Sequence, residues 1–147
     1  MPIINWKKVS FDDELSEFKR TAEDYTPEQS SAGRKKAIES NLRYLKQQYS
    51  KSNPITLTDQ IWKYLGNTDS WDIKNLSDVN DKILKNSKTS GMRDATSVVM
   101  EYMSGSVRSP IVLQTGDGYI LIAGNTRLMV AKALGISPKC VIIKTDW

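Results

Sequence analysis

The sequence predicts an α+β fold, a small mixed sheet with helices, preceded by a helical N-terminal extension. Three observations lead to this prediction. Residues 11–66 contain segments with apolar side chains at helical spacing. Residues 110–123 form two apolar runs around a Gly-Asp-Gly turn at Gly116–Gly118, which is typical of a β-hairpin. A helical pattern over residues 125–134 and a further apolar run at 140–143 follow the hairpin directly.

The N-terminal part is expected to hold three helices. Residues 11–24 are amphipathic, with acidic side chains early, and predict a short helix. Thr26 and Pro27 are typical of a helix start and predict a long helix that ends near Tyr49. A third helix is expected from Thr58, ended by Gly66. The apolar stripe of the long helix comprises Ala37, Ile38, Leu42, Leu45 and Tyr49.

The turn-rich residues 66–70 mark the expected boundary, with a helical extension over 1–66 and a core over 71–147. At the start of the core, Trp71–Ile73 predicts a short strand and Asn75–Lys85 a helix. A polar loop and a helix over 93–103 follow, before the hairpin. In that helix we expect Val98, Val99, Tyr102 and Met103 to face inward.

Composition limits the possible chemistry. The 147 residues are 39% hydrophobic and 26% charged, which predicts one globular domain, or a small core with an extension. No apolar run is long enough to cross a membrane, and the N-terminal residues are unlike a signal peptide, so we expect a cytoplasmic protein without a membrane partner. Histidine is absent, which excludes Ser-His-Asp catalysis and most zinc sites. The single cysteine, Cys140, lies in an apolar run and is expected in the core.

The junction Gly124-Asn125-Thr126-Arg127 is the strongest functional candidate. It lies between the second apolar run of the hairpin and the helix that follows. Such a junction aims backbone N–H groups and the positive end of a helix dipole at one point, which suits a phosphate. Asn125 could cap the helix through its side chain. Arg127 could hold two phosphate oxygens with its forked cation, or form a surface ion pair.

The stretch DGYILIAGNTRLMVAKALGI, residues 117–136, resembles the ParB/sulfiredoxin superfamily. Partition-type ParB domains carry a Gly-Glu-Arg-Arg box after a similar strand, and sulfiredoxin carries Gly-Cys-His-Arg. The free serine kinases of the superfamily carry Gly-His-Thr-Arg, which is nearest to Gly124–Arg127. Small members include ParB-like nucleases and kinases, many of them encoded by phages, for which the host cytoplasm is the implied location.

The resemblance implies that Arg127 contacts the phosphates of a nucleotide, ATP or CTP. It also implies a second group of hydroxyl and basic residues at the start of the preceding helix, and the matching positions include Arg93 and Ser97. Arg108, before the hairpin, either reaches toward the ligand or caps the sheet edge. From their place in the sequence, Asp94 and Glu101 are the carboxylates expected to act as a catalytic base or to hold Mg²⁺.

Departures from the family pattern exclude two activities. Asn125 stands where sulfiredoxin has its reactive cysteine, which argues against sulfinic-acid reduction. No helix-turn-helix segment follows the box, and a second nucleotide box of partition ParB proteins is lacking, which argues against a DNA-sliding clamp.

Three functional hypotheses remain open. The first is a nucleotide- or phosphate-binding enzyme for phosphoryl transfer or phosphodiester cleavage, acting on or near DNA, with nucleotide and Mg²⁺ as cofactors. The second is a non-catalytic module whose site senses nucleotide or is empty, and whose N-terminal helices recruit a protein or DNA. The third is direct DNA binding through basic residues of the long helix, although interleaved glutamates also fit an ordinary solvated face. These basic residues are Arg34, Lys35, Lys36 and Arg43.

Overall fold

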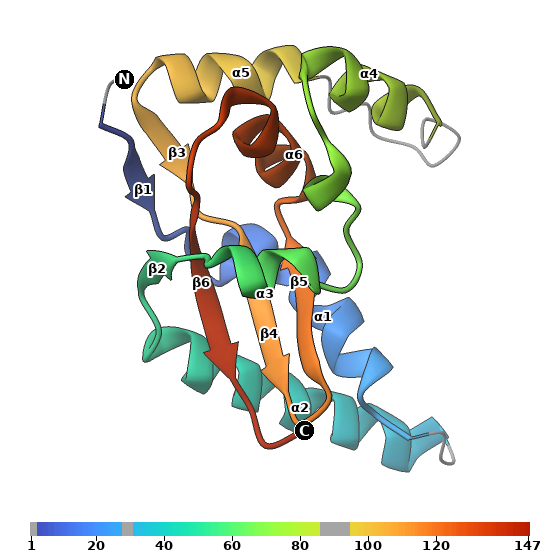
Figure 1. Cartoon of the computed structure of the whole chain (residues 1–147). Coiled ribbons are helices and arrows are strands. Elements are labelled where there is room, and N and C mark those ends of the chain that lie inside the picture. Colours follow the sequence, from blue (N-terminus) through green and yellow to red (C-terminus); the bar gives the residue numbers. More distant parts are fainter. Residues whose placement is uncertain (1–2, 28–30, 86–94) are drawn as a thin grey trace.

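A computed structural model describes residues 3–27, 31–85 and 95–147 (Figure 1). Its centre is a mixed four-stranded sheet in the order β2-β6-β4-β5. β4 is antiparallel to β5 and parallel to β6, and β2 is antiparallel to β6. The predicted α+β class and the hairpin around Gly116–Gly118 are thereby confirmed. The four strands are β2 (Pro54–Thr56), β4 (Ile111–Thr115), β5 (Gly118–Ala123) and β6 (Lys139–Lys144).

A smaller sheet pairs β1 (Asn5–Lys7) in parallel with β3 (Ser106–Arg108). The N-terminal helices expected from the sequence are present. The helices of the described residues are the 3₁₀ helix η1 (Asp12–Glu14), α1 (Leu15–Asp24), α2 (Ser31–Ser50), α3 (Asp59–Lys63), the 3₁₀ helix η2 (Ser70–Asp72), α4 (Leu76–Lys85), α5 (Ala95–Met103) and α6 (Asn125–Leu134).

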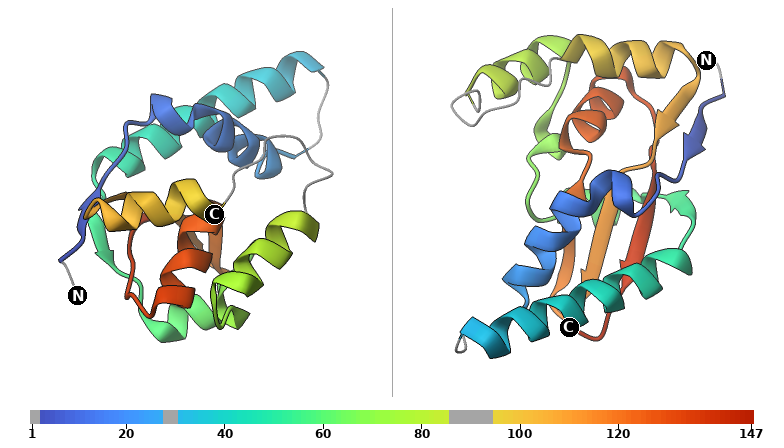
Figure 2. Two further views of the ribbon diagram at one scale, coloured as in Figure 1. Left: turned by 90° about the horizontal axis from the view of Figure 1, so that it is seen from above. Right: turned by 180° about the vertical axis from the view of Figure 1, so that it is seen from behind.

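The central sheet is covered on both faces (Figure 2). α1 and α2 pack on one face, whereas α3, α4, α5 and α6 lie on the other. Successive side chains of a strand point to opposite faces, and β6 follows this rule. Cys140 and Ile142 join the cluster under α6, while Val141 and Ile143 join the cluster under α1 and α2. A sheet that is buried on both faces explains why its strands are continuous apolar runs in the sequence.

Several predicted helices are confirmed. Residues 125–134 form α6, with Gly135 in the left-handed conformation at its end. Residues 76–85 form α4, and its first turn is closed reciprocally: the Asp78 amide donates to Asn75 Oδ1, and the Asn75 amide donates to Asp78 Oδ2. In α2, Leu45 and Tyr49 are buried, as the apolar stripe predicts. The predicted start of α2 borders residues 28–30, which lie outside the described residues.

Two predictions around residues 66–73 are wrong. Trp71–Ile73 is not a strand, because residues 70–72 form η2, anchored where the indole nitrogen of Trp62 donates to the buried Ser70 hydroxyl (2.8 Å). α3 ends at Lys63, and Gly66 does not cap it. The Gly66 amide instead donates to the Tyr119 carbonyl oxygen (2.9 Å), so residue 66 pairs with the edge of β5.

Three further differences concern exposure and short strands. Met103 was expected to face inward, but it is 77% exposed, because it lies in the last turn of α5 beyond the covered surface. The short strands β1 and β2 were not expected. β2 contributes an edge of the central sheet, so residues 1–66 supply strands as well as helices. Within the described residues, no helix is both long and apolar enough to cross a membrane.

Candidate functional site

The turn between β5 and α6 can be built only with glycine. Gly124 has a φ of +102°, a left-handed conformation that side chains disfavour. A Cβ atom on Gly124 would also lie 2.7 Å from Cβ of Pro110, which precedes β4. The backbone of the turn therefore lies directly against the neighbouring strand. This close approach fixes the position of the first turn of α6.

Within the described structure, the N-terminal end of α6 has backbone N–H groups without a hydrogen-bond acceptor. The Leu128 amide donates to the Gly124 carbonyl oxygen (3.0 Å), which closes the first turn. The amides of Asn125 and Thr126 have no acceptor among the described residues. Together with the helix dipole, such amides attract an anion. The predicted side-chain cap at Asn125 is wrong, because its Oδ1 accepts a hydrogen bond from the Thr68 hydroxyl (2.6 Å) instead.

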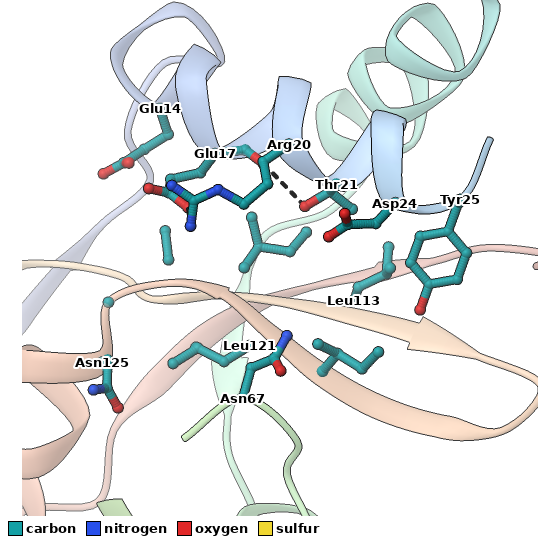
Figure 3. Close-up of a pocket in the computed structure, with 14 residues that line it drawn as sticks. Glu14, Glu17, Arg20, Thr21, Asp24, Tyr25, Asn67, Leu113, Leu121 and Asn125 are labelled. Atoms are coloured by element: carbon teal, nitrogen blue, oxygen red, sulfur yellow. Dashed lines mark hydrogen bonds and ion pairs between the residues drawn. The ribbon is translucent and has the colours of Figure 1, made fainter. Parts of the chain in front are cut away.

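A groove with a volume of about 620 Å³ reaches this end of α6 (Figure 3). Polar side chains of η1 and α1 form one wall, and the opposite wall is the apolar surface of β4 and β5. Gly124 and Asn125 lie at one end. The lining residues are Glu14, Glu17, Arg20, Thr21, Asp24, Tyr25, Asn67, Leu113, Ile120, Leu121, Ile122, Ala123, Gly124 and Asn125.

The charges of the groove are mostly negative. Among the described residues, three carboxylates line it, against the single cation of Arg20. The Arg20 guanidinium lies 3.5 Å from a Glu17 carboxylate oxygen, and this pair is largely exposed on the arginine side. Asp24 has no hydrogen bond or ion pair with the described residues. A bare anion would therefore meet repulsion from α1 as well as attraction from the amides of α6.

Arg127 does not line the groove, because it is buried behind it. Its side chain is 3% exposed, and its Nη2 lies 3.7 Å from Oε1 of Glu14, which is itself buried. Its Nη1 donates to the Arg108 carbonyl oxygen (3.4 Å), and the Tyr102 hydroxyl donates to the Arg127 carbonyl oxygen (2.7 Å). Arg127 thus links α6 to η1, β3 and α5. Arg127 is therefore not the surface ion pair considered from the sequence, and its removal would take away buried volume as well as charge.

Glu101 and Arg108 are paired with each other. The Arg108 amide and Nε donate to Oε1 of Glu101 at 2.8 and 3.1 Å. Burial raises the pKa of Glu101, but the Arg108 hydrogen bonds and charge outweigh it, so the pKa lies below its ordinary value. A carboxylate with a low pKa is a weak base. Neither residue lines the groove, and the pairing caps the end of β3, the structural role considered for Arg108.

The remaining predicted site residues either lie away from the groove or fall outside the described residues. Thr126 is half-buried in the first turn of α6, and Ser97 is exposed on α5. Neither lines the groove. Arg93 and Asp94 lie outside the described residues, so their predicted roles stay predictions. The structure therefore brings Gly124 and Asn125 into one groove and places Arg127, Arg108 and Glu101 beside it.

The sequence also contains a pattern that indicates the acidic wall of the groove, formed by the carboxylates of η1 and α1. Glu14, Glu17, Thr21 and Asp24 are spaced by three or four residues, the interval that places side chains on one face of a helix. The helix was predicted, but its acidic residues were interpreted only as a favourable N-terminal charge. Their spacing indicates a continuous polar face along α1, and this face lines the groove.

The buried nucleophiles are unreactive. Cys140 is fully buried, which confirms the predicted core position, and burial raises the pKa of its thiol to about 12. Burial likewise raises the pKa of Tyr49 to about 12. Both groups are neutral at physiological pH. Thiolate chemistry at Cys140 is therefore excluded in the folded protein.

In the described part of the chain, no cluster of three or more acidic or cysteine side chains is arranged to hold a metal ion.

Comparisons with protein-family models, with curated proteins and with solved structures gave no match. The functional assignment must therefore come from the groove itself and from the sequence pattern of residues 117–136.

Proposed function

We propose that the chain binds a nucleotide in the groove, with its phosphates at the N-terminal end of α6. One observation carries this proposal: the groove of about 620 Å³ ends at Gly124 and Asn125, where the amides of Asn125 and Thr126 have no acceptor among the described residues. Oriented amides at a helix start are a recurrent phosphate site in proteins. The resemblance of residues 117–136 to the ParB/sulfiredoxin superfamily supports the same assignment.

The acidic wall favours a nucleotide that arrives with Mg²⁺. Mg²⁺ usually binds proteins through one or two carboxylates, with phosphate oxygens and water as its other ligands, rather than through a cage of side chains. Glu17 and Asp24 on α1 fit this mode, because they line the groove without forming a cluster with a third ligand in the described chain. The ion would neutralise charge on the phosphates and reduce their repulsion from α1.

The reaction class that we propose is phosphoryl transfer or phosphodiester cleavage, acting on or near DNA. Such reactions depend mainly on positioning and charge neutralisation, so the lack of histidine is no obstacle. Glu17 and Asp24 replace Glu101 as candidates for the base, because they line the groove and Glu101 does not. The nucleotide is ATP or CTP, as the family resemblance implies.

A non-catalytic nucleotide sensor is the alternative function. One observation favours it: Arg127, Arg108 and Glu101 all form ion pairs within the protein. A ligand would have to compete with these pairs to engage the same side chains. In this alternative, the helix start and the groove bind nucleotide, and no bond is broken.

The binding proposal is tested by Asn125→Asp. This change keeps the acceptor for Thr68 and adds a negative charge, which a helix N-terminus tolerates. We expect the wild-type protein to be stabilised by Mg²⁺-nucleotide, by about 2.7 kcal/mol at a hundred times the Kd, and the variant to lose most of this effect. The measurement is a thermal-shift series with ATP, CTP and ADP, with and without Mg²⁺.

Asn75→Asp is the matched control, since it makes the same change at the start of α4, outside the groove. It should respond to nucleotide like the wild type. Equal responses in both variants, or no response in the wild type, would show that the start of α6 is not the phosphate site.

Glu17→Gln and Asp24→Asn separate enzyme from sensor. If the groove is catalytic, each change should lower nucleotide hydrolysis or nucleic-acid cleavage at least tenfold and weaken the Mg²⁺ dependence. Asp13→Asn is the control, because Asp13 belongs to η1 but does not line the groove. A wild-type protein that binds nucleotide tightly but turns nothing over would establish the sensor.

A further inference from the structure

α2 has a concentration of positive charge that is independent of the groove. Residues 31–50 contain five basic residues and one acidic residue, Glu39, which gives a net charge of +4. The entire chain also has a net charge of +4. The rest of the chain has no net charge, because residues 1–30 carry −3 and residues 71–147 carry +3. The +4 of α2 is nevertheless concentrated within 20 residues.

The basic side chains share the outer face of α2. Lys35, Lys36, Arg43 and Lys46 are exposed, and Lys51 extends the row just beyond the helix. The opposite face is buried through Leu45 and Tyr49 against the central sheet (Figure 2). At 1.5 Å per residue, the row from Lys35 to Lys51 is about 24 Å long. We name this set of five side chains the basic face.

The basic face makes only weak contacts within the described structure: Lys46 Nζ lies 5.9 Å from the centre of the Phe11 ring, and Lys51 Nζ donates to Gln48 Oε1 (3.5 Å). None of the ion pairs among the described residues includes a residue of α2, although Glu39 lies between Lys35 and Arg43. Arg34, which the sequence placed with this group, differs from the others. Its guanidinium donates to the Thr26 carbonyl oxygen (2.9 Å) and holds the chain between α1 and α2. The basic face proper is therefore available to an external anion.

We infer that the basic face binds the phosphate backbone of double-stranded DNA. A row of about 24 Å matches about seven base pairs, at 3.4 Å per base pair along one strand. None of the large hydrophobic side chains exposed in the described structure lies on α2, so this helix has no apolar surface to insert into a membrane. Its aromatic residues are also unavailable for base stacking, since Tyr49 is buried and Tyr44 packs on Trp147, which disfavours single strands.

Backbone contacts of this kind carry no sequence preference. Their role is to hold the protein on DNA. The inference does not require the groove to bind nucleotide. The two surfaces can therefore succeed or fail separately.

The test is fluorescence anisotropy with a labelled duplex of about 20 base pairs, over a range of salt concentrations. The variant is the triple change Lys35→Gln, Lys36→Gln and Arg43→Gln. We expect binding at 100 mM salt to weaken at least tenfold, and the slope of log K against log salt to fall by about three. The matched control removes the same charge elsewhere, through Lys63→Gln, Lys74→Gln and Lys139→Gln, which are exposed outside α2.

Weaker binding by the triple variant could also result from unfolding. A variant that is expected to strengthen binding controls for this. Glu39→Gln removes the one acidic residue of α2 and should tighten duplex binding two- to fivefold. The inference is overturned if the control triple weakens binding as much as the α2 triple, or if the wild type shows no duplex binding at 50 mM salt. Preference for a single strand, or for anionic lipid vesicles over duplex, would also overturn it.

Two readouts separate this inference from the proposed nucleotide site. The α2 triple variant should keep the thermal response to nucleotide, and Asn125→Asp should keep duplex binding. Loss of both nucleotide binding and duplex binding in either variant would show that the two surfaces are not independent.

Discussion

The two ends of α6 use the same residue type for different reasons. Gly124 at the start and Gly135 at the end both have left-handed backbone conformations. At Gly135 a Cβ atom would meet nothing within 4 Å, whereas at Gly124 it would collide with Pro110. The end of the helix therefore needs glycine only for its conformation, and the start needs it also for space. Close packing is thus concentrated at the end of α6 that borders the groove.

The basic residues at the two ends of α6 also differ in their surroundings. Lys132, in the last turn, donates to the Trp71 carbonyl oxygen (2.6 Å) and lies near the negative end of the helix dipole. Arg127, in the first turn, lies near the positive end, where a cation is disfavoured. Its buried pair with Glu14 offsets that unfavourable position. The charge at the start of α6 is therefore offset by a carboxylate of η1, whereas the charge at its end is favoured by the helix dipole and binds a backbone carbonyl oxygen of η2.

The largest expected effect comes from breaking the buried pair. Arg127→Met should lower the free energy of unfolding by about 3–5 kcal/mol, because Glu14 would remain buried without its cation. Lys132→Met, the matched change at the other end, should cost about 1 kcal/mol, since it removes a hydrogen bond to a carbonyl oxygen but leaves no buried charge without its partner. Urea unfolding of both variants measures the difference. A cost below 1 kcal/mol for Arg127→Met would mean that Glu14 turns into the groove and becomes hydrated.

The glycines give the next largest contrast. Gly124→Ala should cost about 2–4 kcal/mol, because the left-handed conformation and the collision with Pro110 add together. Gly135→Ala should cost only the conformational part, about 1 kcal/mol. Thermal and urea unfolding provide the measurement. Equal costs at the two positions would indicate that the chain around Pro110 moves aside easily, and that the turn is less tightly fixed than its geometry implies.

The smallest expected effect is on the free energy of unfolding at alkaline pH. Burial raises the pKa of the Cys140 thiol to about 12, from an ordinary value of 9.0, while the charge of Arg127 acts in the opposite direction. Below pH 9 the thiol is neutral in both folded and unfolded chains, so its contribution is constant. Between pH 9 and 12 only the unfolded chain loses the proton, and stability falls as pH rises. Urea unfolding between pH 8 and 10.5 should show a shallower decline for Cys140→Ala than for the wild type.

The C-terminal third could be predicted from the sequence because local signals agree there. The glycine turn, the apolar runs and the glycine that ends α6 each specify their element without help from distant residues. The region around residues 66–73 was mispredicted because tertiary contacts decide it. Gly66 pairs with β5, and Trp62 fixes Ser70 through its indole nitrogen, and neither contact leaves a periodic pattern in the sequence.

The candidate site was predictable only in part, for a similar reason. The turn at Gly124 follows from local sequence, whereas its surroundings depend on which helix covers the sheet. Glu14 belongs to η1, more than 100 residues before Arg127, and nothing in the local sequence of either residue indicates the pairing. The sequence therefore placed its candidate carboxylates, Asp94 and Glu101, just before the hairpin, whereas the carboxylates that line the groove belong to η1 and α1.

The strand order of the central sheet has a consequence for how the protein folds. β6 lies between β4 and β2, although it is the last strand in the sequence and β2 lies more than 80 residues earlier. On the ribosome, β2 cannot find its partner until residues 139–144 have emerged, and β1 must likewise wait for β3. The hairpin of β4 and β5 can form early, but closure of the sheet is non-local and should be slow. A chain stalled before β6 would expose apolar surfaces of β4, α1 and α2, so aggregation during synthesis is the main hazard of this topology.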